Sequence, residues 1–128
     1  MLRMFFVTLM WSVLVQVANA HELTPTYFDI KSSHKSGVVQ TDLVLFNRRE
    51  DVLYYEISVF DKNWNSIPFA AVKRIVEVEY LERKKIRLFL RGQDRERIMY
   101  VCTRSLLLSG SVESSGVSSR ICSKRNTK

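Results

Sequence analysis

Apolar residues recur at every second position through most of the sequence from residue 24 onward, which is the spacing of β-strands with one buried face. In the run 52–60, one side carries Leu53, Tyr55, Ile57 and Val59. Further runs of this kind cover residues 27–30, 38–47, 76–80, 86–90, 98–102 and 121–122. About seven such strands, separated by turn residues and without a convincing helix, predict an all-β, immunoglobulin-like antiparallel β-sandwich.

The alternation leaves two points open. The stretch 72–85 also fits near-helical spacing, although its Val and Ile content favours strands. The face on which a residue lies depends on strand register, which a shift of one residue inverts. On the expected register, Tyr55, Tyr80 and Tyr100 lie in the core, whereas Tyr54, Trp64 and Phe89 lie outward or in loops and are candidates for a binding surface.

The first 20 residues have the pattern of a cleaved secretory signal peptide. Arg3 precedes an apolar run at 4–15, and the small residues Ala18 and Ala20 form a cleavage site. A membrane anchor is the alternative, but the run is shorter than the about 20 apolar residues that span a bilayer. We expect the product in the periplasm or secreted, without stable membrane insertion. The chain then divides into a signal peptide (1–20), a sandwich domain (21–123) and a basic polar tail (124–128).

Cleavage defines the charge of the exported product. It removes 20 of the 128 residues and one of the 20 basic groups, so the remaining 108 residues keep 13 acidic groups and a net charge of +6. A basic patch is expected at Lys84, Lys85, Arg87 and Arg91. Positive charge of this kind can bind acidic partners or protect an edge strand from aggregation. Export argues against nucleic acid as the partner.

The two cysteines, Cys102 and Cys122, form an even pair in a small exported chain, which favours a disulfide over a metal site or a reactive thiol. Closing the loop between them stabilises the fold by roughly 3 kcal/mol in the loop-entropy description. Two reduced, buried cysteines are the alternative if the chain is not exported.

Four segments resemble the amino-terminal domain of PapD-like periplasmic pilus chaperones. Residues 22–25 resemble the first strand of that domain, 41–47 its second strand with a terminal Asn, 53–60 its third strand, and 94–101 its Asp-Arg-Glu run before an apolar strand. The resemblance extends over most of residues 22–108. One subgroup of these chaperones has a disulfide between the last two strands, where Cys102 and Cys122 lie.

The resemblance implies that the chain binds protein subunits of a surface or pilus-like structure by β-strand addition at a sheet edge. Alternatively, the same open sheet edge allows the chain to form a dimer. The family also has a second domain and a basic cleft, whereas this sequence ends after the first domain and has Thr26 and Tyr27 where the family has an Arg. The candidate partner-binding residues are Val112, Val117, Arg120, Ile121 and Lys124.

Motifs for catalysis are missing from the sequence. It contains no local pairing of a nucleophile with a base, no Gly-rich phosphate loop and no Cys or His cluster at zinc spacing. We therefore predict a non-enzymatic domain without a cofactor. One alternative is a periplasmic copper-binding module, in which His21, as the amino terminus after cleavage, binds copper with His34. Another is a structural or adhesive component of the cell surface.

Overall fold

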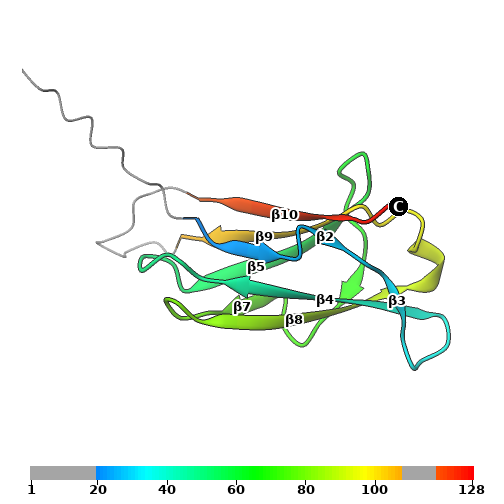
Figure 1. Ribbon diagram of the computed structural model, residues 1–128, viewed down its shortest axis with the longest axis horizontal. Helices are drawn as coiled ribbons and strands as arrows, with labels where there is room; N and C mark the ends of the chain where they lie inside the picture. Colours follow the sequence, from blue (N-terminus) through cyan, green and yellow to red (C-terminus); the bar gives the residue numbers. More distant parts are fainter. Residues whose placement is uncertain (1–19, 108–117) are drawn as a thin grey trace, which may run out of the picture.

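The computed structural model describes residues 20–107 and 118–128, and in these ranges the chain forms a β-sandwich of two five-stranded sheets (Figure 1). The strands are β1 (Glu22–Thr24), β2 (Tyr27–Phe28), β3 (Lys31–Ser32), β4 (Val38–Phe46), β5 (Tyr54–Phe60), β6 (Phe69–Ala70), β7 (Ile75–Glu77), β8 (Arg83–Arg91), β9 (Tyr100–Leu106) and β10 (Arg120–Arg125). A single turn of 3-10 helix, η1 (Gly92–Asp94), follows β8. The predicted all-β fold is confirmed. In the described ranges no helix has the length and apolar character needed to cross a membrane.

The first part of the chain contributes short strands to both sheets. Sheet A has the order β1-β4-β8-β6, with β3 also paired to β4, and sheet B has the order β2-β10-β9-β5-β7. All pairings are antiparallel except that of β2 with β10, which is parallel. The chain therefore enters the fold in sheet A as β1 and crosses to sheet B as β2. Short edge strands of this kind raise the number of strands above the seven expected from the sequence.

The core follows the period-two pattern in the long strands. In β4, the alternate residues Val39, Thr41, Leu43 and Leu45 are buried. In β5 and β8 the buried residues are Tyr55, Ile57 and Val59, and Ile86, Leu88 and Leu90. The stretch 72–85 contains β7 and the start of β8, so its helical alternative is wrong.

Three residues that were predicted in the core, Leu53, Tyr80 and Tyr100, are not buried in it. The strands next to them begin or end at different residues than the apolar pattern predicts. Leu53 precedes β5, and Tyr80, which is 48% exposed, lies in the turn after β7. Tyr100 begins β9 on its outer face. Ile98 is buried, but it lies in a turn before β9, where its backbone N–H donates to the Asp94 carbonyl. The two-residue alternation of a strand therefore does not connect Ile98 with Tyr100, and the two side chains lie on different faces.

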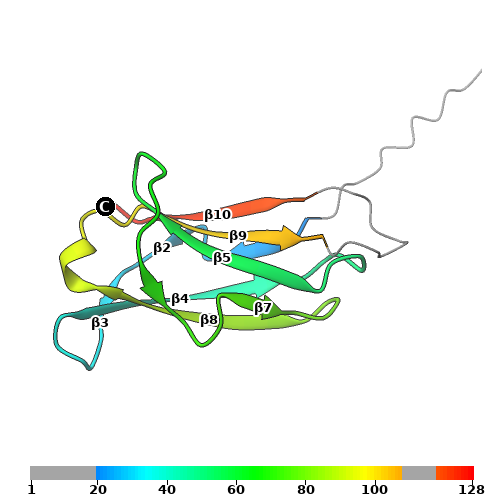
Figure 2. The same cartoon turned by 180° about the vertical axis from the view of Figure 1, so that it is seen from behind.

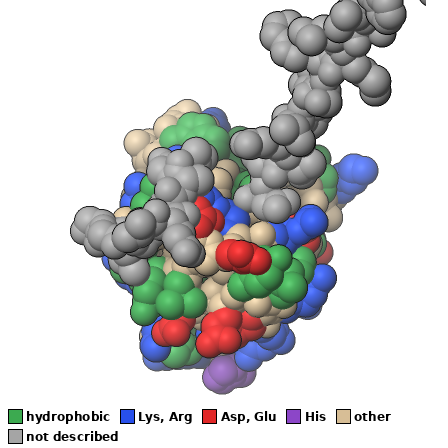
Figure 3. All heavy atoms as spheres, turned by 90° about the vertical axis from the view of Figure 1, so that its left-hand side faces the viewer, with side chains coloured by type: hydrophobic (Ala, Val, Ile, Leu, Met, Phe, Trp, Pro, Cys, Tyr) green, Lys and Arg blue, Asp and Glu red, His purple; other side chains and the backbone are tan. Residues whose placement is uncertain are grey.

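Hydrophobic side chains also reach the surface at the end of the sandwich that carries the β4–β5 and β7–β8 connections. Leu53, Tyr80 and Leu81 are exposed there. Figure 3 shows this end, where hydrophobic and acidic side chains lie next to one another.

Asn47 joins these two connections from a fully buried position after β4. Its Nδ2 donates to the carbonyls of Val52, at 2.7 Å, and Val78, at 2.8 Å. Its Oδ1 accepts the backbone N–H of Arg49, at 2.9 Å, and the hydroxyl of Tyr55. Buried polar groups are costly unless they are hydrogen-bonded. The four bonds of this one side chain therefore hold both connections in place.

We predict that Asn47→Ala lowers the free energy of unfolding by roughly 3–5 kcal/mol, because it leaves several buried donors and acceptors without partners. Urea denaturation followed by circular dichroism measures this loss.

Thr41→Val is the matched contrast within the same sandwich. The Thr41 hydroxyl is buried and has no hydrogen-bond partner among the described residues. Its replacement should cost less than about 1 kcal/mol or stabilise the fold. Equal losses for the two variants would contradict the role given to the Asn47 hydrogen bonds.

Candidate functional site

The outer edge of β10 is the first candidate site, and the hydrogen bonds of β10 show which groups it presents. The backbone N–H of Arg125 donates to the carbonyl of Met99 at 2.7 Å, on the β9 side. In an antiparallel pair, alternate residues bond to the neighbouring strand and the residues between them point away from it. The backbone groups of Arg120, Cys122 and Lys124 therefore face away from β9, toward the outer edge of sheet B.

Among the residues that the structure describes, only the last part of this edge is paired with another strand, although β1 also lies close to β10. β2 pairs with Lys124 and Arg125, and the Lys124 N–H donates to the Thr26 carbonyl at 3.0 Å. β1 pairs with β4 in sheet A instead. Among the described residues, no strand pairs with the outer edge of β10 from Arg120 to Ser123. This segment has the form of an edge to which a further strand can be added.

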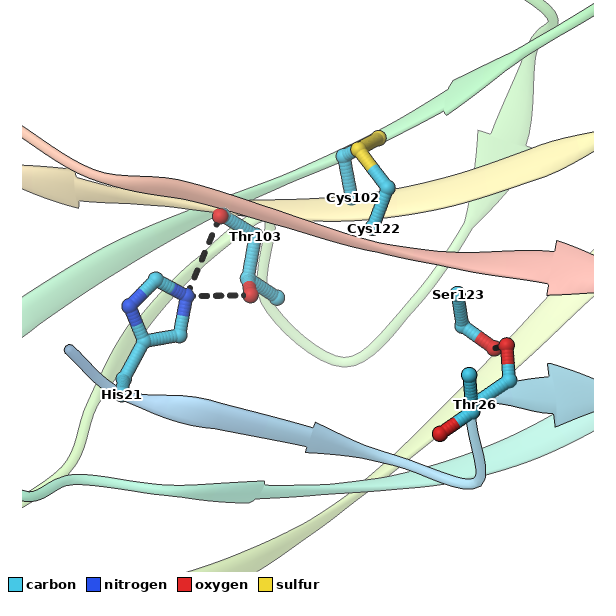
Figure 4. The surroundings of a disulfide bond; sticks show 6 residues. All are labelled: His21, Thr26, Cys102, Thr103, Cys122 and Ser123. Carbon is cyan, nitrogen blue, oxygen red and sulfur yellow. Dashed lines mark hydrogen bonds between the residues drawn. A yellow bond between two sulfur atoms is a disulfide. The ribbon is translucent and has the colours of Figure 1, made fainter.

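The disulfide between Cys102 and Cys122 fastens β10 to β9 beside this edge (Figure 4). The two residues lie directly opposite each other, with Cα atoms 4.0 Å apart. They occupy a pair without mutual backbone bonds, where the side chains of antiparallel strands approach most closely. The bond fixes the register of β10 against β9. Ser123 adds a second attachment, because its hydroxyl donates to the Pro25 carbonyl at 2.6 Å.

His21 lies between the sheets at the start of the described chain. It is buried, and its Nε2 is 2.7 Å from Oγ1 of Thr103 (Figure 4). Its Nδ1 is 3.3 Å from Oγ of Ser119. Its ring packs on Tyr55, with centroids 4.6 Å apart. The pKa of His21 is lowered from 6.5 to about 4, chiefly by burial; the hydrogen bond to the Thr103 carbonyl opposes this shift, and the charge of Arg49 contributes to it. The ring is therefore neutral at neutral pH and fastens the first described residues to β9 and to Ser119, the residue before β10.

The structure does not bring His21 and His34 together. His21 adjoins the pair Glu22↔Phe46, at the end of β4. His34 follows the pair Ser32↔Val39, near the start of β4, and is exposed. These two ends of β4 are separated by about 20 Å or more at 3.4 Å per residue. The two histidines therefore cannot hold one copper ion, and the described residues contain no group of three or more side chains suited to a metal.

The predicted partner-binding residues fall into three places. Arg120 and Lys124 are exposed on the outer face of β10, whereas Ile121 faces inward and packs against the core. Val112 and Val117 lie outside the described residues. Lys124 and Arg125 belong to β10, so the strand includes two residues that the sequence assigned to a polar tail.

An aromatic cluster lies on the same outer face and was not predicted as a unit. The rings of Trp64 and Tyr100 stack in parallel, with centroids 4.2 Å apart, and Phe60 lies 5.6 Å from Trp64. The Arg120 guanidinium lies over the Phe60 ring at 5.5 Å. Trp64 is 49% exposed, which agrees with its predicted place outward or in a loop. The four-residue spacing from Phe60 to Trp64 was the only sequence signal for this cluster.

Comparison with known proteins gives a structural likeness. No family model matches the sequence, and no curated protein matches it. Among solved structures, the E. coli chaperone DraB superimposes with a TM-score of 0.62 and 13% sequence identity, over 83% of this chain and 53% of that chain. The chain thus spans about half the length of that chaperone. At this identity the likeness shows the fold alone, an immunoglobulin-like β-sandwich.

We predict that the protein loses roughly 3 kcal/mol of unfolding free energy as the pH falls from 6.5 to 4, because the unfolded state binds a proton at His21 that the folded state does not. His21→Gln should flatten the stability curve across this window. The pKa values of Asp42 and Asp61 are also lowered, from 3.8, so these residues weaken the fold mainly at still lower pH. Urea denaturation at a series of pH values measures the effect, and an unchanged slope in His21→Gln would contradict it.

Proposed function

We propose that this chain is an exported, non-enzymatic binding domain that holds protein subunits of a surface or pilus-like structure, in the manner of a periplasmic assembly chaperone. Binding takes place by addition of a subunit strand to the outer edge of β10. The observation that carries the proposal is the open edge from Arg120 to Ser123, next to a segment of β10 that is already paired with β2. The fold that the chain shares with the chaperone DraB supports it.

The attachments of β10 suit it to this role. The disulfide to β9 and the Ser123 hydrogen bond to Pro25 hold the strand before any partner arrives. A strand that is already ordered loses little conformational freedom on binding, so more of the interaction energy contributes to affinity. The exposed backbone groups of Arg120 and Cys122 then supply hydrogen bonds, which do not depend on the partner's sequence.

Side chains along the edge provide selectivity. Arg120 and Lys124 place two positive charges on the outer face, next to the aromatic rings of Phe60 and Trp64. Ile121 presents an apolar surface on the inner side. A subunit strand with apolar residues on one side and acidic or aromatic residues on the other fits both faces. We also propose Val112 and Val117, which lie outside the described residues, as apolar contacts of the subunit.

Export forms part of the same proposal. The signal-like segment 1–20 directs the chain to the periplasm or out of the cell, and the disulfide suits an oxidising compartment. The domain beginning at His21 then acts without a cofactor, because strand addition requires only backbone groups and packing.

Arg120→Pro tests the proposal. The Arg120 N–H points away from β9, so proline at this edge position removes no bond of the β9–β10 pairing and is compatible with an edge strand. We expect the variant to fold, with its disulfide intact, and to lose the stoichiometric complex with subunits that the unmodified protein forms in periplasmic extract. Size-exclusion chromatography and mass spectrometry measure the complex.

Arg120→Ala is the matched control, since it removes the same side chain and keeps the N–H. It should retain most of the binding. A complex that survives Arg120→Pro would contradict strand addition at β10. Recovery of the protein as a regular component of an assembled fibre would instead establish a structural role.

A further inference from the structure

The sandwich has a second open border on the opposite side, between β7 of sheet B and β8 of sheet A (Figure 2). A groove of about 1010 Å³ lies between the two strands. Its apolar lining includes Ile57, Val76 and Ile86, which are core residues that the groove leaves within reach of the surface. The lining also includes charged side chains of both signs, namely Glu77, Glu79 and Glu82 and Lys73, Lys84, Lys85 and Arg87, so the groove combines apolar and charged surface.

The backbone edge of β8 is open along this groove. On one side β8 pairs with β4 over its whole length. On the other side β6 pairs only with Phe89 and Leu90. Within the part of the chain that the structure describes, no strand pairs with this side of β8 from Arg83 to Leu88. The unpaired length fits an extended segment of about six residues, or about 20 Å.

The two faces of this edge differ in chemistry. Ile86 and Leu88 face inward, whereas Arg83, Lys85 and Arg87 are exposed on the outer face. A strand added to β8 would continue this alternation, with every second side chain directed to the groove side and the others beside the three cations.

The outer face carries a surplus of positive charge. Asp42 pairs with both Arg87, at 2.7 Å, and Lys85, at 3.8 Å. Arg83 has no ion pair among the described residues, and its guanidinium lies over the Phe46 ring at 4.0 Å. One carboxylate therefore serves two of the three cations, which leaves the outer face of β8 with a surplus of positive charge. An incoming strand with carboxylates on this face would compensate the remaining charge.

The β8 edge of a second copy of this chain does not fit the edge. In a two-fold antiparallel pairing, the cations of one β8 would lie beside the same cations of the other, and like charges in neighbouring strands are destabilising. We propose that the groove between β7 and β8 is a second peptide-binding site, which takes an extended segment of a partner protein with alternating acidic and apolar residues. The acidic residues lie beside Arg83, Lys85 and Arg87, and the apolar residues enter the groove. This site does not depend on strand addition at β10.

Lys84 defines one end of the site. Its ammonium group donates to the Glu77 carbonyl of β7 at 2.6 Å and lies 3.6 Å from the carboxylate of Glu82. The side chain therefore crosses from one sheet to the other and closes the groove at the start of β8. The bound segment extends from this point toward β6.

The test uses a fluorescently labelled peptide of alternating Glu and Val, with a Lys and Val peptide and a Glu and Ser peptide as controls. Fluorescence anisotropy should show saturable binding of the Glu and Val peptide and at least tenfold weaker binding of both controls. N-methylation of alternate peptide amides separates strand addition from charge attraction. Because β8 pairs with only one edge of the peptide, one set of methylated positions should abolish binding and the other should be tolerated.

Protein variants locate the site. The double variant Lys85→Glu with Arg87→Glu should weaken binding about tenfold or more, because two attractive contacts become repulsive. The matched charge reversal Lys62→Glu with Lys128→Glu, at exposed residues outside the groove, should change affinity much less. Arg120→Pro at the β10 edge should have no effect. Circular dichroism verifies that each variant is folded, and amide chemical shifts should change along β7 and β8.

Three results would overturn the inference. Failure of the Glu and Val peptide to bind would show that the cations only protect an exposed edge. Loss of binding in Arg120→Pro would place the peptide at β10. Equal tolerance of both sets of methylated amides would exclude strand addition at β8.

Discussion

The first part of the chain divides its backbone hydrogen bonds between two sheets, as β1 in sheet A and β2 in sheet B, and the candidate site exists because of this division. β1 pairs with β4 in sheet A, and β2 then pairs with only the last two residues of β10 in sheet B. The earlier residues of β10 keep outward-facing backbone groups, while the disulfide and His21 hold the surrounding structure in place. The β8 edge is open for a different reason, since β6 is only two residues long.

Most of the fold could be predicted from the sequence because the long strands bury one face. The alternation around Leu43, Ile57 and Leu88 specified both the strands and their inward faces. The predicted positions are wrong for residues near the ends of strands. An apolar residue in a turn continues the alternating pattern, so the sequence does not distinguish it from a residue in the strand. Tyr80 and Tyr100 are examples, and the side-chain pattern gives no signal for the two-residue strands that set the sheet order.

Less of the candidate site was accessible to sequence reasoning. The cysteine pair was predicted correctly because compartment and parity restrict the choices for two cysteines. The aromatic stack of Trp64 on Tyr100 brings together residues from a loop and a strand, which no spacing rule connects. For His21, the sequence suggests copper binding as an alternative, whereas the structure shows a buried side chain. Its burial against Thr103 depends on how the two sheets pack, and sequence periodicity does not report such contacts between layers.

Amide hydrogen exchange along β10 in the free protein tests the central claim most directly, because each amide reports whether it is hydrogen-bonded. Slow exchange is expected at Ile121 and Ser123, which face β9, and fast exchange at Arg120 and Cys122, which face the open edge. Nuclear magnetic resonance resolves these four amides separately. Uniformly slow exchange at all four would show that the outer edge is already covered, and would contradict the claim.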